Sequence, residues 1–245
     1  MNALPSRKDE AFRYADIDAL ASVWSDLSHP ETIEIAAQHK LQQIWLPSDA
    51  EVQIRRVDMT VGQAASATIF ALNSASRYGR IELDVTLHEG ADFNLHAANI
   101  GGGSATLEIV TTVRHIAPSA TSCQVIRSVL GGTATGNYLG KVAVAREGQR
   151  TDSEQSVKAM LLSRGATANA KPELEIYADD VKCAHGASVG ELDRDQLYYA
   201  AARGLDPASA RALLLEGFVG GLWDGIDGDH QGIADAARAA LRAIA

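Results

Sequence analysis

The sequence predicts a mainly β protein with helical segments at both ends. Apolar and polar residues alternate from about residue 50 to about residue 190, which is typical of half-buried strands. Turn residues such as Glu89-Gly90 and Glu147-Gly148 separate the alternating runs. After residue 192 the apolar spacing changes to that of amphipathic helices. The pattern indicates a sandwich, a barrel or a β-helix, and the pattern alone does not choose among them.

Three segments are therefore expected: a mostly helical segment at 1–48, a strand-rich core at 49–190 and a helical region at 191–245. No strict short repeat is visible, so a β-helix would have to be irregular. The alternation places these side chains on buried strand faces: Ile81, Leu83, Val85, Leu87, Leu107, Ile109, Val113, Val142 and Val144.

The C-terminal region contains clear helix boundaries. Asp193 and Gln196 have the spacing of a capping box, and Gly204 is suited to the end of that helix. Asp206-Pro207 then predicts the start of the next helix, because proline is tolerated in a first turn. The apolar stripes expected on these helices comprise Leu215, Phe218, Val219, Leu222 and Trp223, and then Ile233, Ala237, Ala240, Leu241 and Ile244.

Composition excludes several classes of function. The 245 residues carry a net charge of -9, which argues against a nucleic-acid partner. The sequence contains no run of 18 apolar residues, so no membrane span is predicted. The first ten residues do not resemble a signal peptide. Two cysteines are too few for a disulfide framework, so a reducing compartment, the cytoplasm, is expected.

The most informative segment is 171–190, in which Cys183 and His185 stand two residues apart at the end of an alternating run. Residues two apart on a strand share a face, and thiolate and imidazole are good ligands for borderline transition metals. Two ligands alone leave a metal site incomplete, and a site shared across an interface would solve that shortage. The alternative is a cysteine that packs as a small apolar side chain beside a hydrogen-bonded histidine.

Other chemically active residues are given smaller roles. Glu173, Glu175 and Tyr177 share one face of the same run, where they could tune the site, join a dimer interface or simply face solvent. Cys123 is expected in the core and His115 in a structural role. The glycines at 101–103 form a turn, since no Lys-Ser/Thr pair or helix follows them.

The segment 171–190 and its continuation through Asp193, Gln196 and Gly204 resemble the SufB/SufD family of iron–sulfur cluster assembly scaffolds, and SufD more closely. The resemblance is specific over 171–218 and looser upstream. The matching segments are 171–190, 192–193, 196–199, 203–205, 210, 213–214 and 217–218, with 113–118, Ser122 and a relaxed entry motif at 10–17.

The resemblance implies a right-handed parallel β-helix core between an N-terminal helical segment and C-terminal helices. It also implies a dimer, formed with a SufB-like chain or with a second copy through the C-terminal end of the β-helix. A SufC-like ABC ATPase would dock on the C-terminal helices, with Leu215, Phe218, Val219, Leu222 and Trp223 as candidate contacts besides their packing on the core. The chain would act as a non-enzymatic scaffold for a transient iron–sulfur cluster, without a permanently bound cofactor.

Two positions depart from the SufB pattern. Val157 stands where SufB has a cluster-related cysteine, and Gly186 stands where SufB has a glutamate. The chain is also short for SufD, mostly through loss of N-terminal sequence and of β-helix turns.

Two alternative functions remain at this point. One is a structural partner subunit without metal chemistry. The other is a β-helix carbohydrate-active enzyme using Asp179 and Asp180, or Glu173 and Glu175. Adjacent strand residues point to opposite faces, which makes Asp179 and Asp180 a poor acid/base pair.

Overall fold

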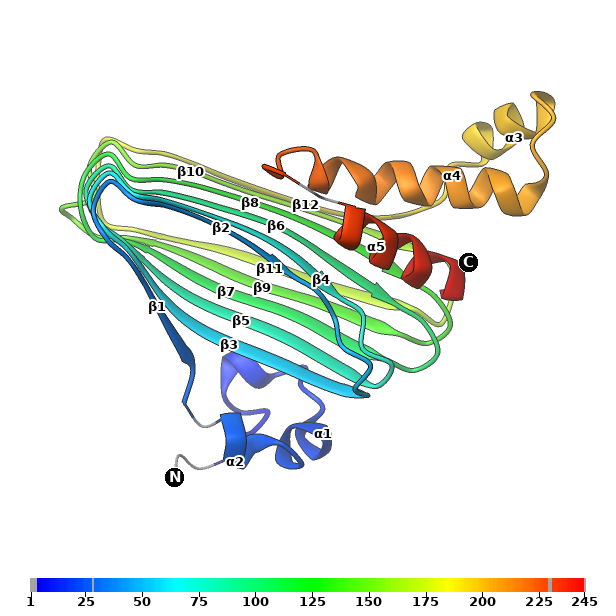
Figure 1. Ribbon diagram of the computed structural model, residues 1–245, viewed down its shortest axis with the longest axis horizontal. Helices are drawn as coiled ribbons and strands as arrows, with labels where there is room; N and C mark the ends of the chain where they lie inside the picture. The colour runs from blue at the N-terminus through cyan, green and yellow to red at the C-terminus, as the bar shows by residue number, and fades with distance from the viewer. Residues whose placement is uncertain (1–3, 28, 229–230, 245) are drawn as a thin grey trace.

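Two parallel six-stranded sheets form the body of the protein. The computed structural model describes residues 4–27, 29–228 and 231–244. Odd-numbered strands lie in one sheet and even-numbered strands in the other, so the chain passes from sheet to sheet as it winds (Figure 1). This is a β-solenoid, and the expectation of a parallel β-helix core with helices at both ends is confirmed.

We call the first sheet the odd sheet. Its spatial order follows the sequence, and every pairing within it is parallel. Its strands are β1 (Glu31–Ile35), β3 (Val52–Val61), β5 (Tyr78–Leu87), β7 (Thr106–His115), β9 (Thr135–Val144) and β11 (Thr167–Ile176).

The second sheet, the even sheet, is built in the same way. Its strands are β2 (Lys40–Trp45), β4 (Ser66–Asn73), β6 (Asp92–Gly101), β8 (Thr121–Leu130), β10 (Asp152–Leu161) and β12 (Lys182–Glu191).

The coils stack in register over a long and slightly variable repeat. Tyr78 pairs with Thr106 and Thr106 with Thr135, steps of 28 and 29 residues, and Thr135 pairs with Thr167 after 32 more. Corners of different length absorb the difference. This variation explains why no short repeat is visible in the sequence.

One face of each sheet points to the other sheet, and we call it the interior face. Leu83, Val85 and Leu95 are among its fully buried side chains, and the two sheets share one apolar cluster there. Each coil covers the apolar interior of its neighbour, so burial grows with the number of stacked coils.

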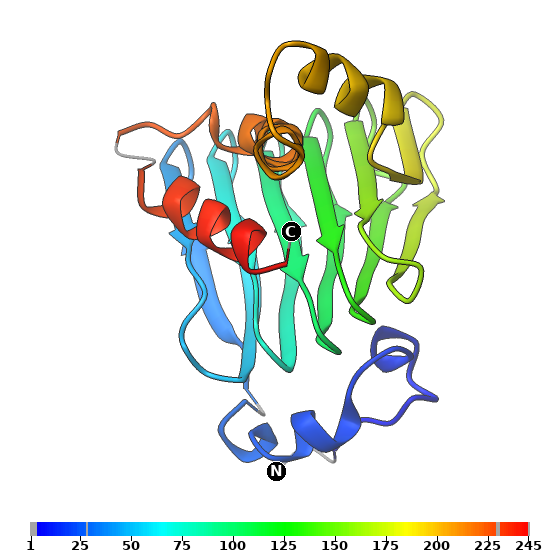
Figure 2. The same ribbon diagram turned by 90° about the vertical axis from the view of Figure 1, so that its right-hand side faces the viewer.

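Helices cover the opposite, outer faces (Figure 2). Short N-terminal helices lie on the odd sheet: η1 (Glu10–Phe12), α1 (Ile17–Ala21) and α2 (Trp24–Leu27). The C-terminal helices lie on the even sheet: α3 (Arg194–Ala202), α4 (Pro207–Gly220), η2 (Gly221–Trp223) and α5 (Gln231–Ile244). Among the described residues, no helix has the length and apolar character needed to cross a membrane.

The predicted helix boundaries are confirmed. The Asp193 carboxylate accepts from the backbone N–H of Asp195 and Gln196, and Asp206 caps α4 with Pro207 in its first turn. Gly204 has a φ of 91°, which suits glycine at the end of α3.

The expected limit of the N-terminal segment is wrong. Strands β1 and β2 lie within residues 1–48, which were expected to be mostly helical. They have only five and six residues, and β2 carries Gln42 and Gln43 at its centre. Alternation over so few positions is a weak signal, and parallel pairing with β3 and β4 supplies what the local pattern lacks.

A buried ionic cluster joins the N-terminal helices to the odd sheet. The Arg80 guanidinium, fully buried, donates to the Glu108 carboxylate at 2.9 Å and to Glu82 at 2.8 Å. The Tyr78 hydroxyl donates to Glu108 at 2.6 Å, and the Phe12 ring lies over Arg80 at 4.2 Å. Every charge in this cluster has a partner of opposite charge, as burial requires.

The first prediction concerns this cluster. Glu108→Gln leaves buried Arg80 with less negative charge beside it, so we expect a loss of about 3–5 kcal/mol in the free energy of unfolding. Asp84→Asn is the matched control, because the Asp84–Arg114 pair is about 40% exposed and its loss costs under about 1 kcal/mol. Urea unfolding of both variants measures the difference. Equal effects would contradict the role given to the cluster.

The second prediction concerns His115, which is fully buried on the interior face. Burial lowers its pKa from 6.5 to about 4, so the unfolded chain binds more protons than the folded one between these values. Stability should therefore fall by up to about 3 kcal/mol on this account as the pH drops from 6.5 to 4. His115→Gln should show a shallower decline in urea unfolding across that range. Parallel declines would mean that other groups cause the acid sensitivity.

Candidate metal site at the open end of the solenoid

Cys183 and His185 lie on the last strand of the even sheet. Strand β12 begins at Lys182, and its register places Cys183 beside Ser153 and His185 beside Gln155 of β10. Ser153 and Gln155 are buried on the interior face. Cys183 and His185 therefore lie on the interior face of the last strand, and the expectation that both share one face of a strand is met.

No described strand follows β12, so the interior of the solenoid is uncovered at this end. All residues of β12 except Cys183 are exposed. Cys183 is half-buried, and like Leu174 and Val181 it packs against the buried cluster of Val142, Val144 and Ala178. Burial raises the pKa of the Cys183 thiol, and the Asp152 carboxylate adds to this effect. A metal ion would have to displace the thiol proton to bind there.

A line of polar side chains leads along the interior face to Cys183. His115 Nε2 lies 3.0 Å from Ser122 Oγ, and Ser122 Oγ lies 2.9 Å from Ser153 Oγ. Ser153 is the register partner of Cys183. Cys183 thus occupies the next position of a hydrogen-bonded series, which supports His115 in the structural role expected for it.

A second polar line leads to His185. The Thr111 hydroxyl donates to Gln124 Oε1 at 2.7 Å, and the Tyr138 hydroxyl donates to the same oxygen at 3.2 Å. Gln155 Nε2 then donates to the Tyr138 hydroxyl at 3.0 Å. Gln155 is the register partner of His185.

The opposite wall of the open end supplies no ligand. Ala170, Pro172 and Leu174 of β11 pair with Tyr138, Gly140 and Val142, and so share the interior face. In the part of the chain that the structure describes, no group of three or more His, Cys, Asp or Glu side chains could hold a metal ion. The two donors at this end are of suitable chemistry for iron, but they form an incomplete site.

Glu173, Glu175 and Tyr177 are not brought to Cys183 and His185. The two glutamates lie on the outer face of the odd sheet, where Glu175 pairs with Lys141 and Glu173 with Lys171. The Tyr177 hydroxyl donates to Glu175 at 2.6 Å. The wall of the solenoid separates this group from the interior face.

The structure also shows where the carboxylates considered for a carbohydrate-active enzyme lie. Glu173 and Glu175 are both engaged by lysines, and Asp179 and Asp180 are exposed in the turn after β11. Nothing in these positions brings two free carboxylates together across a cleft.

The apolar stripe expected on the C-terminal helices packs inward. Leu215, Val219, Leu222 and Trp223 are almost fully buried against the even sheet, among side chains such as Phe70. Phe218 is half-buried, with the Arg127 guanidinium 5.9 Å from its ring centre. The four buried side chains cannot contact a partner directly, so only the packing half of their expected mixed role is seen.

Other side chains of this region are available to a partner. Tyr198 and Tyr199 of α3 are 78% and 62% exposed, and Leu213 of α4 is 56% exposed. A depression of about 410 Å³ beside α3 is lined by Arg164, Arg194 and Arg211, among others. The sequence analysis missed this surface because the spacing of apolar residues identifies the face that packs, not the face that is left outside.

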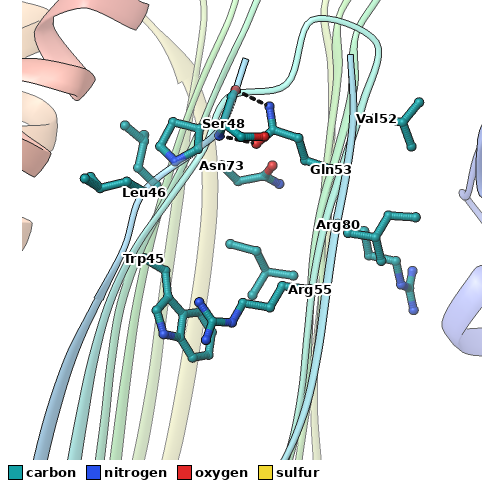
Figure 3. A pocket seen from close by; sticks show the side chains of 12 residues that line it. Trp45, Leu46, Ser48, Val52, Gln53, Arg55, Asn73 and Arg80 are labelled. Carbon is teal, nitrogen blue, oxygen red and sulfur yellow. Dashed lines mark hydrogen bonds between the residues drawn. The ribbon is translucent and has the colours of Figure 1, made fainter. Parts of the chain in front are cut away.

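A second cavity lies at the other end of the solenoid, near the turn after β2. Its volume is about 330 Å³, and Trp45 and Arg55 lie in it side by side with the guanidinium 4.1 Å from the ring centre (Figure 3). Gln53 is held by Ser48, and Arg55 pairs with Glu31 at 2.9 Å. The cavity contains neither of the residues expected to bind a metal.

The interior glutamines are functional candidates that sequence reasoning passed over. Gln124 and Gln155 are buried at 0% and 1% exposure, at positions where the alternation places core residues. A polar residue at an interior position was the signal that could have identified them.

The fold and this end together define a class of protein: a β-solenoid that carries a thiol and an imidazole on the interior face of its open end, with a helical appendage. The model of the SUF system FeS cluster assembly SufBD core domain matches residues 32–218. The chain therefore belongs to the SufBD family, as the sequence resemblance indicated.

Individual relatives agree with this assignment. The chain is 31% identical over 166 residues to an iron-sulfur cluster assembly SufBD family protein of Synechocystis, covering 67% of this chain and 37% of that protein. It is 25% identical over 198 residues to the iron-sulfur cluster assembly protein SufD of Escherichia coli, covering 80% of this chain and 47% of that protein. The SufD of Bacillus subtilis is 25% identical over 164 residues, 67% of this chain and 36% of the relative. The chain thus spans about a third to a half of the length of these relatives.

Proposed function

We propose that this chain is a SufD-like scaffold subunit in iron–sulfur cluster assembly. The observation that carries the proposal is the position of Cys183 and His185, side by side on the uncovered interior face of the final strand. Family membership supplies the context, and the donor chemistry suits iron. The cluster is cargo, held transiently, and the chain contributes ligands rather than catalysis.

The remaining ligands come from a second chain that covers the open end. Strand β12 is a ten-residue edge strand, and from Ala184 to Gly190 it contains no lysine, glutamate or proline that would protect it against pairing. Val189 is 50% exposed on its interior face. Another solenoid end, from a SufB-like chain or a second copy of this one, would bury these groups and extend both sheets.

The energy source lies in another partner. We propose that a SufC-like ABC ATPase docks on α3 and the exposed side of α4, around Tyr198, Tyr199 and Leu213. The sequence has no Walker motif, so ATP hydrolysis would be the partner's. The assembly would work in the cytoplasm, where cysteines stay reduced.

One observation favours a second candidate, a structural subunit without metal chemistry. Cys183 packs against the buried cluster of Val142, Val144 and Ala178, and the raised pKa of its thiol keeps it protonated. A cysteine in this setting behaves as a small apolar side chain. This candidate and the first one differ in what substitutions at Cys183 and His185 do.

The third prediction separates the two candidates. In the complex with its partners, reconstituted with iron and sulfide without oxygen, His185→Ala should lower the bound cluster at least about fivefold, and Cys183→Ala should lower it less. His88→Ala and Cys123→Ala are matched controls, an exposed histidine and a half-buried cysteine away from the open end. Iron and sulfide analysis of the purified complex measures the effect. If the complex forms normally and neither variant loses cluster, the structural subunit is correct.

The fourth prediction concerns the open end as an interface. Val189→Asp puts a charge on the interior face where a partner would bury it, so association should weaken at least about tenfold. Ser188→Asp is the matched control, because its side chain lies on the outer face of the same strand. Light scattering with and without the partner chain measures the mass of the assembly. An unchanged mass in Val189→Asp would show that β12 is not at the interface.

A further inference from the structure

Gln155 has a buried oxygen without a hydrogen-bond partner. The side chain is 1% exposed, its Nε2 donates to the Tyr138 hydroxyl at 3.0 Å, and its Oε1 has no partner among the described residues. An unpaired buried carbonyl costs free energy, and such groups are rare in folded proteins. The oxygen therefore needs an explanation.

The direction of the hydrogen bonds determines which amide atom is left over. The Tyr138 hydroxyl donates its proton to Gln124 Oε1, so toward Gln155 it can only accept. An acceptor there requires the Gln155 nitrogen to face Tyr138. The Gln155 oxygen is then the atom left without a partner.

Two residues flank Gln155 on the interior face of the even sheet. Gln124 lies in register on one side and His185 on the other. Adjacent strands are about 4.8 Å apart, so an imidazole at 185 is within reach of the oxygen. Gln124 Nε2 also has no hydrogen-bond partner, so it does not donate to Gln155 Oε1. Both lone pairs of that oxygen are therefore available to another donor.

We propose that Gln155 is a positioning residue for His185: its Oε1 accepts the N–H of one ring nitrogen, so that the other ring nitrogen points out of the open end. The part of this inference that concerns metal binding rests on the proposed function. Histidines that bind metals almost always donate their second N–H to an oxygen, which selects the tautomer and the ring orientation. The bond forms when the ring turns toward the interior, and a partner that covers the end would exclude the water that competes with it.

The chain offers variants that isolate this contact. Gln155→Met keeps the volume and removes the acceptor, whereas Gln155→Glu keeps an acceptor oxygen. Ser153→Ala is the matched control, since it also removes a buried polar group from the interior face of β10 but lies in register with Cys183 rather than with His185. Thermal unfolding verifies that each variant is folded.

The first measurement does not depend on metal. Nitrogen-15 NMR of the imidazole, assigned by comparison with His185→Ala, reports which ring nitrogen of neutral His185 carries the proton. We expect one tautomer to dominate in the unmodified protein and in Gln155→Glu, and a mixture in Gln155→Met. Ser153→Ala should resemble the unmodified protein.

The second measurement is Co²⁺ binding followed by absorbance. Gln155→Met should weaken Co²⁺ binding by about 10–100-fold, the usual effect of losing such a partner. If Gln155→Met leaves the tautomer unchanged, or if Ser153→Ala alters it as much, Gln155 Oε1 does not select the tautomer of His185 and the inference is wrong. If the tautomer responds but Co²⁺ binds equally to His185→Ala, Gln155 positions His185 and the metal role fails instead.

Discussion

In-register stacking of coils is the constraint on which the rest of this structure depends. Each coil has an apolar interior face that only the next coil can bury, as the shared cluster of the two sheets shows. The last strands of both sheets, β11 and β12, therefore cannot satisfy themselves. A solenoid of this kind necessarily ends in unpaired backbone groups and uncovered interior side chains. Such an end can pair with the strands of a partner.

The outer faces follow the same logic with different chemistry. The even sheet is covered by apolar side chains of α4 and α5, which makes the stripe from Leu215 to Trp223 a structural element. The odd sheet is covered by an apolar cluster that includes Phe12 and Leu20, and beneath Phe12 the buried charge of Arg80 is neutralised by Glu82 and Glu108. Both outer faces are thus occupied near their helices, whereas the interior face of β12 and the exposed sides of α3 and α4 are left uncovered.

Much of this could be predicted from residues alone. Period-two spacing located strands such as β5 and β9, because apolar residues alternate from Ile81 to Leu87 and from Val142 to Val144. Asp193 and Pro207 marked the helix starts, because capping is local. Strands β1 and β2 were not predicted, since they are stabilised by pairing with residues more than 20 positions away. The side of the wall on which Glu175 lies, and the pairing of Gln155 with His185, likewise depend on register across coils that the chain connects by corners of varying length.

The interior polar lines explain why the open end differs from a simple unfinished core. A solenoid that only needed stability would continue its interior with Val and Leu, since buried polar groups cost free energy unless paired. Instead Ser122 and Ser153 lead to Cys183, and Gln124 and Gln155 lead to His185. These lines place hydrogen-bonding atoms directly behind the two potential ligands, where a metal-binding side chain needs support. The unpaired oxygen of Gln155 is the atom to which the proposed hydrogen bond from His185 would be made.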